Sequence, residues 1–205
     1  MENHLYTLTQ DELNLKRMKS GIEIDCDKTK QLNVSVLEEE KKRKDLLIIY
    51  TGGTFGMDLN ENGHLTIKGT ASLANKLKEH NIFVDKEYTF LHGENEFFIT
   101  QPFNNTRIFY KIHQYETLID SSDTNIPFLL KLTKTIEQRY ADFDAFLIIH
   151  GTDTMEYTAS VLSFMIKGLN KMIILTGSQI PLAKTINDAY RNLLGSLRLI
   201  GTLNS

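Results

Sequence analysis

Two segments, one hundred residues apart, each place threonine residues on a glycine-rich turn that directly follows an apolar run. The first is LLIIYTGGTFGM, residues 46–57, and the second is FLIIHGTDTMEY, residues 146–157. In each segment, four or more apolar residues end abruptly in glycine and hydroxyl residues, a pattern typical of a buried strand followed by a tight turn. In α/β proteins, ligands bind at the carboxyl ends of parallel strands. Two hydroxyl-bearing turns of this kind can face one substrate, which favours an enzyme.

Both turns carry groups suited to chemistry, and both also have a purely structural explanation. Gly52 and Gly53 let the backbone approach a ligand closely and expose amide groups that can stabilise an oxyanion. Such turns also occur for conformational reasons alone. Thr152 and Asp153 place a hydroxyl beside a carboxylate, which can orient a water molecule or a ligand amine, or can simply cap the following helix.

Other polar groups near predicted strand ends have the same two interpretations. The segment DSSD, residues 120–123, lies between a strand and a helix and can serve as a cap. His150, at the end of an apolar strand, is more typical of a hydrogen-bonded structural histidine than of a catalytic one. The polar turn TGSQIPL, residues 176–182, is expected mainly to shape a loop. The sequence contains neither a metal-ligand spacing nor a nucleotide-binding fingerprint, so we expect no metal and no cofactor.

The elements that must position these turns alternate between strand and helix from residue 45 onward. Strands are predicted over residues 46–50, 87–91, 108–115, 145–149 and 172–176. Helices are predicted over residues 69–79, 125–140, 158–168 and 190–197, the second capped by Thr124 or Asn125 with Pro127 in its first turn. This alternation predicts a three-layer α/β fold, a mostly parallel sheet flanked by helices on both faces. Residues 92–107 are expected to form a surface insertion.

Composition excludes several classes of function. The chain has 205 residues, 41% of them hydrophobic, and a net charge of −3 without a basic stripe, so we expect no nucleic-acid partner. Cys26 is the single cysteine, which rules out an internal disulfide and fits a reducing compartment. The N-terminus does not resemble a signal peptide, and no window approaches the roughly 18–20 apolar residues of a membrane span. We therefore expect a cytoplasmic protein without a membrane partner.

The first 44 residues differ from the rest of the chain. They are polar, lack a sustained periodicity and end in the charge run EEEKKRK, residues 38–44. Such a run is usually a solvated helix face or a flexible arm, and less often a docking or regulatory arm. We predict a flexible N-terminal extension over residues 1–44 and one α/β domain over residues 45–205.

Taken together, the segments TGGTFG, IDSSD, HGTDTMEYTAS and TGSQIPL, in this order, resemble the L-asparaginase/glutaminase family of bacterial type. The resemblance is closest to the cytosolic type I branch, which recurs as the N-terminal part of some animal asparaginase-lysophospholipases. It runs from about Leu46 to the end of the chain, and the pair TGGT and HGTDT is highly specific. It implies the N-terminal domain of that family and hydrolysis of the side-chain amide of L-asparagine to aspartate and ammonia, without metal or cofactor.

The resemblance also implies roles for individual residues. Thr54 matches the nucleophile that attacks the amide carbon and forms an acyl-enzyme, a task for which a threonine hydroxyl needs a base and an oxyanion site. Thr152 and Asp153 match the second catalytic pair, and Asp153 also holds the α-amino group of the substrate.

The segment at residues 120–122 matches the part of the family that binds the substrate's charged ends. Asp120, Ser121 and Ser122 correspond to the residues that hold its α-amino and α-carboxylate groups. An amino acid carries one charge of each sign, so a carboxylate and hydroxyls are suitable ligands for it.

The sequence departs from the family pattern in two places. His64 stands where the family's flexible loop has a tyrosine; it can act as a loop base, because the pKa of histidine is closer to neutrality, or the loop is shifted and the tyrosine's role is lost. The family's essential lysine follows the last helix of this chain, and Lys184 does not fit its pattern. A base contributes about 10²–10⁴-fold in rate, so we expect a truncated or impaired form that lacks the C-terminal domain.

Two functions from different classes therefore stand. The favoured one is an asparaginase-type amidohydrolase acting on a small-molecule substrate, L-asparagine, and forming a homo-oligomer if full-length, as the resemblance implies. The alternative is a non-catalytic asparaginase-like module that binds an amino acid or a partner chain.

Overall fold

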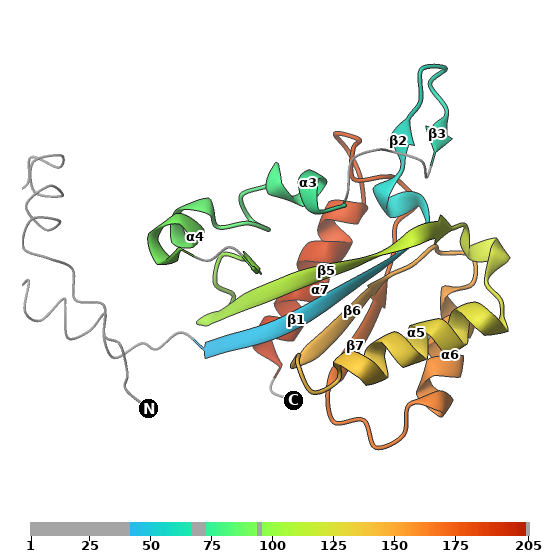
Figure 1. The fold of residues 1–205 in the computed structure, drawn as a ribbon. Coiled ribbons are helices and arrows are strands. Elements are labelled where there is room, and N and C mark those ends of the chain that lie inside the picture. The colour runs from blue at the N-terminus through green and yellow to red at the C-terminus, as the bar shows by residue number, and fades with distance from the viewer. Residues whose placement is uncertain (1–41, 67–72, 94–95, 204–205) are drawn as a thin grey trace, which may run out of the picture. The chain divides into compact units, whose positions relative to one another are not determined.

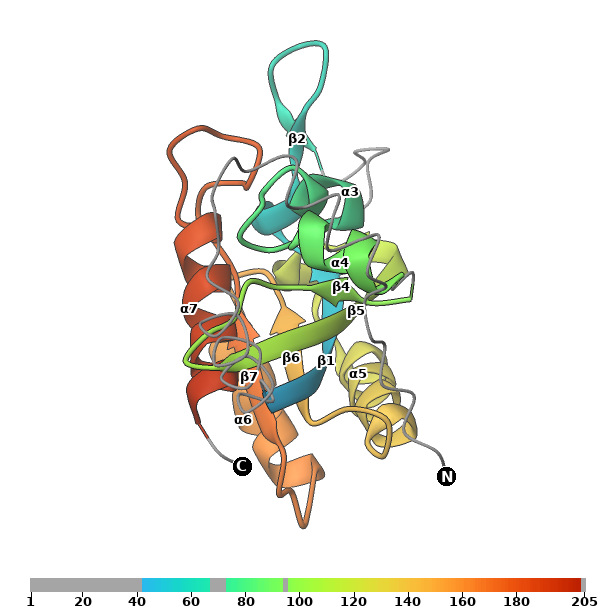
Figure 2. The ribbon, with the colours of Figure 1, turned by 90° about the vertical axis from the view of Figure 1, so that its left-hand side faces the viewer.

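The computed structural model describes residues 42–66, 73–93 and 96–203 of the chain. Within these residues, a five-stranded sheet of order β4-β5-β1-β6-β7 carries helices on both faces (Figures 1 and 2), which confirms the predicted α/β class. The strands are β1 (Lys42–Gly52), β4 (Phe98–Ile99), β5 (Thr106–Ile119), β6 (Ala145–Ile149) and β7 (Met172–Thr176). The helices are α3 (Leu73–Lys78), α4 (Lys86–His92), α5 (Ile126–Arg139), α6 (Met155–Met165) and α7 (Ala189–Thr202). The described residues also contain two short 3₁₀ turns, η1 (Thr54–Gly56) and η2 (Ser121–Asp123), and a hairpin formed by β2 (Asp58–Leu59) and β3 (Leu65–Thr66).

The central strand β1 pairs in parallel with β5 on one side and with β6 on the other. Ile48, for example, lies opposite Ile112 of β5 and Leu147 of β6. β7 runs parallel to β6, and β4 pairs antiparallel with β5 at the opposite edge. Because the four neighbouring strands β5, β1, β6 and β7 run in the same direction, the turns that follow them all lie at the carboxyl ends of the strands, which we call the carboxyl edge of the sheet.

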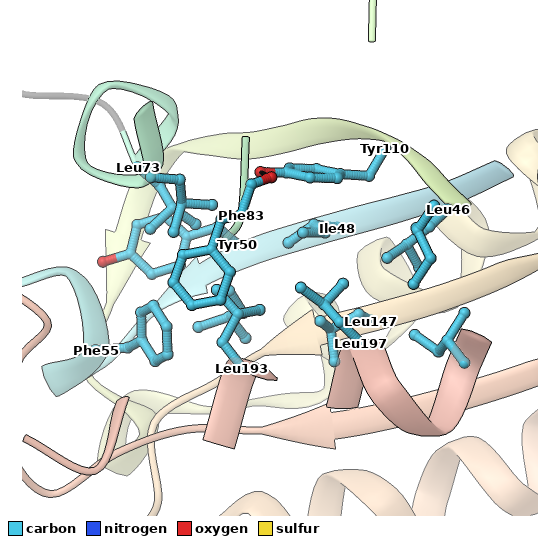
Figure 3. Close-up of a cluster of buried hydrophobic side chains, with 14 of the residues drawn as sticks. Leu46, Ile48, Tyr50, Phe55, Leu73, Phe83, Tyr110, Leu147, Leu193 and Leu197 are labelled. Atoms are coloured by element: carbon cyan, nitrogen blue, oxygen red, sulfur yellow. Dashed lines mark hydrogen bonds between the residues drawn. The ribbon is translucent and has the colours of Figure 1, made fainter. Parts of the chain in front are cut away.

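Two hydrophobic clusters hold the helices to the sheet. Residues Leu46, Ile48 and Tyr50 of β1 pack with α3 and α7 on one face (Figure 3), whereas Leu47 and Ile49 pack with α5 and α6 on the other. Successive side chains of a strand point to opposite faces, so a strand covered on both sides must be apolar at every position. The uninterrupted run LLIIY meets this requirement.

Most sequence-predicted elements are confirmed. The strands at residues 145–149 and 172–176 have the predicted bounds, and the predicted strand at 46–50 lies within β1, which begins earlier and includes residues 42–44. Helix α5 is capped as predicted: the Asn125 side chain accepts a hydrogen bond from the amide of Phe128 at 3.0 Å, and Pro127 lies in the first turn. The strand predicted at 108–115 is longer at both ends, and the helix predicted at 158–168 spans Met155–Met165.

One element was predicted wrongly: residues 87–91 form helix α4 and not a strand. Aromatic residues favoured a strand, but the ends of the segment specify a helix. The Asp85 carboxylate accepts a hydrogen bond from the amide of Tyr88, and Gly93 adopts the left-handed conformation at the C-terminus, with φ of 62°. Local capping therefore outweighs strand propensity here.

The prediction that residues 92–107 form a surface insertion is also wrong in part. Phe98 and Ile99 form β4, and Ile99 is fully buried, as is most of Phe103. A strand of two residues is too short to show a periodicity, which explains the error.

Two predictions lie wholly or partly outside the described residues: residues 1–41 of the predicted extension, and part of the helix predicted over residues 69–79. None of the helices in the described ranges is long and apolar enough to cross a lipid bilayer.

A buried ion pair joins α4 to the sheet. Arg107 of β5 donates a hydrogen bond to the Asp85 carboxylate at 2.6 Å, and the two side chains are 10% and 7% exposed. Its guanidinium also lies 3.9 Å from the ring centroid of Tyr88. Removing one partner of such a pair leaves a buried charge without compensation.

We predict that Asp85→Ala lowers the free energy of unfolding by about 3–5 kcal/mol, measured by urea denaturation. The double variant Asp85→Ala/Arg107→Met should be more stable than Asp85→Ala, because the unpaired charge is gone. As a control, Asp142→Ala in the exposed pair with Arg139 should change the free energy of unfolding by less than about 1 kcal/mol. A double variant at least as unstable as the single one would contradict this assignment.

Candidate functional site

The turns that follow β1 and β6 are in direct backbone contact. Gly53 has a φ of 75°, a left-handed conformation that favours glycine. A Cβ atom added to Gly53 would lie 2.5 Å from the Cα atom of Gly151 and 2.7 Å from its amide nitrogen. Thr51, two residues earlier at the end of β1, donates a side-chain hydrogen bond to the carbonyl of Ile149 at 3.1 Å. The TGGT and HGTDT segments therefore meet through glycines.

The turn that follows β5 joins the same contact. A Cβ atom added to Gly151 would lie 2.5 Å from Oγ of Ser121. Ser121 is buried; its Oγ accepts a hydrogen bond from the amide of Asp153 at 3.2 Å, and its carbonyl accepts one from the Thr154 hydroxyl at 2.8 Å. Three of the predicted segments, at residues 52–54, 120–122 and 151–153, are thus packed together.

A fourth turn, after β7, was expected only to shape a loop but makes two contacts with this group. The side-chain amide of Gln179 donates a hydrogen bond to Oγ1 of Thr152 at 3.0 Å, and the amide of Leu182 donates to the carbonyl of Phe55 at 3.0 Å. The Asp188 carboxylate fixes this turn by accepting from the amides of Gln179 and Ile180. Sequence reasoning missed Gln179, although the segment TGSQIPL that contains it was the available signal.

Thr54 and Asp153 keep their functional groups open. Thr54 begins η1 and is partly exposed, and Asp153 is exposed. Within the described ranges, neither side chain makes a hydrogen bond. Helix α6 begins after Thr154, and its first turn receives no side-chain cap. The capping explanation for Asp153 therefore does not hold, and its carboxylate is free to meet a ligand.

Asp120 and Ser122 are exposed beside the buried Ser121. The Asp120 carboxylate caps η2, because one of its oxygens accepts hydrogen bonds from the amide and the hydroxyl of Ser122, each at 3.0 Å. The capping role considered for this segment is real. The carboxylate nevertheless stays at the surface, next to the turn that holds Thr152.

His64 is not brought to the other candidate residues. It lies on the hairpin of β2 and β3, which projects away from the sheet in both views (Figures 1 and 2). The side chain of Asn60 shapes the hairpin turn by accepting hydrogen bonds from the amides of Asn62 and His64 at 3.0 and 2.9 Å. The His64 side chain is exposed.

His150 has the structural role that its position indicated. It is 1% exposed; Nδ1 lies 2.7 Å from the carbonyl of Gly151, and Nε2 lies 3.2 Å from the hydroxyl of Thr158. Burial lowers its pKa below the ordinary value of histidine. His150 therefore links the turn that contains Thr152 to helix α6 through these two contacts.

Lys184 is exposed on the loop before α7, and it lines a hollow of about 830 Å³.

The four turns together present hydroxyls, carboxylates and backbone amides at one edge of the sheet. Carboxylates suit the amine of a ligand, whereas hydroxyls and amides suit its carboxylate or a developing oxyanion. Among the described residues, no cluster of three or more His, Cys, Asp or Glu side chains is arranged to hold a metal ion. The arrangement is suited to a small ligand that carries both an amine and a carboxylate.

Comparison with known proteins identifies one family. A family model described as "Asparaginase, N-terminal" matches residues 45–205. The 60 kDa lysophospholipase of Mus musculus is 41% identical over 158 residues, which are 76% of this chain and 28% of that protein. L-asparaginase 1 of Escherichia coli (strain K12) is 36% identical over 157 residues, 76% of this chain and 40% of that protein.

A solved structure gives the same result. The crystal structure of L-asparaginase I from Vibrio cholerae O1 biovar eltor matches with a TM-score of 0.59 and 36% identity, over 77% of this chain and 41% of that one. The chain spans less than half the length of each of these relatives.

We predict that Gly151→Ala destabilises the protein by about 1–3 kcal/mol, since the added methyl group must displace Ser121. Gly195→Ala is the matched control: Gly195 lies in helix α7 with open space around it, so alanine should stabilise by up to about 1 kcal/mol. Thermal or urea unfolding measures both changes. Combining Gly151→Ala with Ser121→Gly should cost less than the sum of the two single variants, and strict additivity would show that these turns do not touch.

Proposed function

The chain belongs to the asparaginase family, and on that premise we propose that it is an L-asparaginase-type amidohydrolase, which converts L-asparagine and water to aspartate and ammonia. The observation that supports this proposal most strongly is the packing of Gly53 on Gly151 and of Gly151 on Ser121. It keeps the proposed nucleophile, the second hydroxyl and the proposed amino-acid ligands on adjoining turns.

Thr54 is the proposed nucleophile. Its hydroxyl oxygen attacks the amide carbon of the substrate, its proton passes to the departing nitrogen, and ammonia leaves an acyl-enzyme that water then hydrolyses. The glycine turns beside Thr54 and Thr152 offer backbone amides for the oxyanion of each tetrahedral intermediate. These donors cost little reorganisation, because the contact of Gly53 with Gly151 holds them in place.

Thr152 and Asp153 form the proposed second pair. Because Gln179 donates its hydrogen bond to Oγ1 of Thr152, the hydroxyl proton of Thr152 remains available for the substrate or for water. Asp153 has a free carboxylate one residue further along. It would bind the α-amino group of the substrate through a charge-assisted hydrogen bond.

Asp120, Ser121 and Ser122 complete the proposed amino-acid site. The surface carboxylate of Asp120 adds a second negative group for the α-amino end. The hydroxyl of Ser122 donates to Asp120 at 3.0 Å without ligand, and would exchange that hydrogen bond for one to the α-carboxylate when the substrate binds. Ser121 is buried and acts by holding the amide of Asp153. In this site His64 serves as the loop base only when the hairpin folds toward Thr54.

Membership of the family supports three further proposals about the whole protein. We propose that the substrate is a free small molecule, that the full-length protein is a homo-oligomer, and that it acts in the cytoplasm. The name of the mouse relative raises a lysophospholipase activity as another possibility. The hydroxyls and carboxylates of the four turns suit an amino acid better than a lipid acyl chain.

A non-catalytic binding module is the second candidate. One observation favours it: β7 pairs with β6 and, among the described residues, with no other strand, so its apolar and partly exposed edge can accept another chain. In addition, Lys184 does not match the family's essential lysine. The two candidates differ in whether release of ammonia depends on Thr54.

We predict that the purified chain releases ammonia from L-asparagine and that Thr54→Val lowers the rate on the order of 10³-fold or more, as expected when a nucleophile is removed. Thr133→Val makes the same chemical change on helix α5 and should leave the rate unchanged. A coupled ammonia assay with L-asparagine and L-glutamine measures both rates and the substrate preference. Binding of L-aspartate without Thr54-dependent ammonia release would favour the binding module.

A further inference from the structure

Lys76 of helix α3 is a buried cation to which the proposed reaction assigns no role. It is 9% exposed. Its ammonium donates one hydrogen bond to the carbonyl of Gly56 at 2.7 Å and another to the carboxylate of Asp58 at 2.6 Å. The side chains of Lys76 and Asp58 are 11% and 30% exposed, so this ion pair is far better shielded from water than a surface pair.

The two acceptors lie at a junction in the chain. Gly56 ends the η1 turn that begins with Thr54, and Asp58 begins strand β2, the first strand of the hairpin that carries His64. Met57 lies between them, and its amide donates a hydrogen bond to the carbonyl of Thr54 at 3.1 Å. Lys76 therefore contacts the chain at the point where the proposed nucleophile turn passes into the hairpin.

Lys76 is itself held firmly against the sheet. Its neighbours Leu73 and Leu77 are buried in the cluster drawn in Figure 3, and the backbone amide of Leu73 donates a hydrogen bond to the side-chain oxygen of Gln114 in β5 at 3.0 Å. Helix α3 is short, so these contacts and the ion pair hold it in place together.

The sheet side of the junction is filled by Tyr50. A Cβ atom added to Gly56 would collide with the Tyr50 hydroxyl, so this turn lies directly on the buried ring. Burial raises the pKa of Tyr50 to about 12, and its hydroxyl therefore stays neutral near physiological pH. With a neutral group on that side, Asp58 is the anionic partner of Lys76 at this junction.

We propose that Lys76 is a positioning residue, which clamps the turn of Thr54 and the root of the hairpin to the core through Gly56 and Asp58. This proposal rests on the proposed function in assigning Thr54 as the nucleophile. The clamp acts in two directions. It fixes the backbone two residues after Thr54, and it sets the direction in which β2 leaves the body of the protein and hence where His64 lies.

A merely structural lysine would change global stability alone, whereas a clamp predicts a local effect. In Lys76→Met and in Asp58→Asn, hydrogen exchange of the Met57 amide should become at least about tenfold faster, because the local opening of this junction becomes easier. Exchange in β6 should stay unchanged. Lys78→Met is the matched control: Lys78 lies on the same helix but is exposed, and it should change neither region.

Kinetics provide the second measurement. A displacement of a nucleophile on the order of 1 Å costs about 10²-fold in rate, so Lys76→Met should lower kcat for L-asparagine by about 10–100-fold while changing KM less. Asp58→Asn keeps the shape of the side chain and removes only its charge; it should lower kcat in the same direction and remain folded.

The two measurements separate failure of this inference from failure of the proposed function. If the unaltered chain is inactive toward L-asparagine, the proposed function fails, yet faster exchange at Met57 in both variants still supports the clamp. Unchanged exchange at Met57 in the folded variants overturns the clamp, whether or not the chain is active. In an active chain, faster exchange with unchanged kcat overturns the positioning role.

Discussion

The whole candidate site depends on close packing at two glycines, whose missing side chains let the turns approach each other. Gly53 lies on Gly151, and Gly151 lies on Ser121, at separations that a single methyl group would not allow. Parallel pairing of β1 with β5 and β6 brings the three turns to one edge, but only the glycines let them close on each other. The packing of interiors is dense enough that one added carbon must move a neighbour. Chemistry at this edge is therefore specified by small residues as much as by the polar ones.

Polar groups around this contact divide into those that build the site and those left open. His150, Ser121 and Asp188 are satisfied by internal hydrogen bonds and hold turns in place. Thr54 and Asp153 have no such partners among the described residues. Groups that are already satisfied rigidify a site, whereas exposed groups without partners can exchange water for a ligand at little cost. Lys76 is one of the groups that build the site, because its hydrogen bonds to Gly56 and Asp58 hold the start of the hairpin in place.

Residue patterns predicted the fold well where strands are buried on both faces. The runs LLIIY, AFLII and MIILT gave β1, β6 and β7, because continuous apolar residues leave few alternatives once turn residues follow. They failed at residues 87–91 and 98–99, where helix caps and a two-residue strand carry almost no periodic signal. Within the site, the motif residues were identified, but the contact of Gln179 with Thr152 and the ion pair of Lys76 with Asp58 were not. Such contacts join segments 18 or more residues apart, and no local pattern encodes them.

A crystal structure with bound L-aspartate, the product of the proposed reaction, tests the central claim most directly. The account predicts one amino-acid molecule at the carboxyl edge of the sheet, with its side-chain carboxylate beside the Thr54 hydroxyl, its amine at Asp153 and its α-carboxylate near Ser122. A ligand bound elsewhere, or these three side chains found on separate surfaces of the protein, would contradict it.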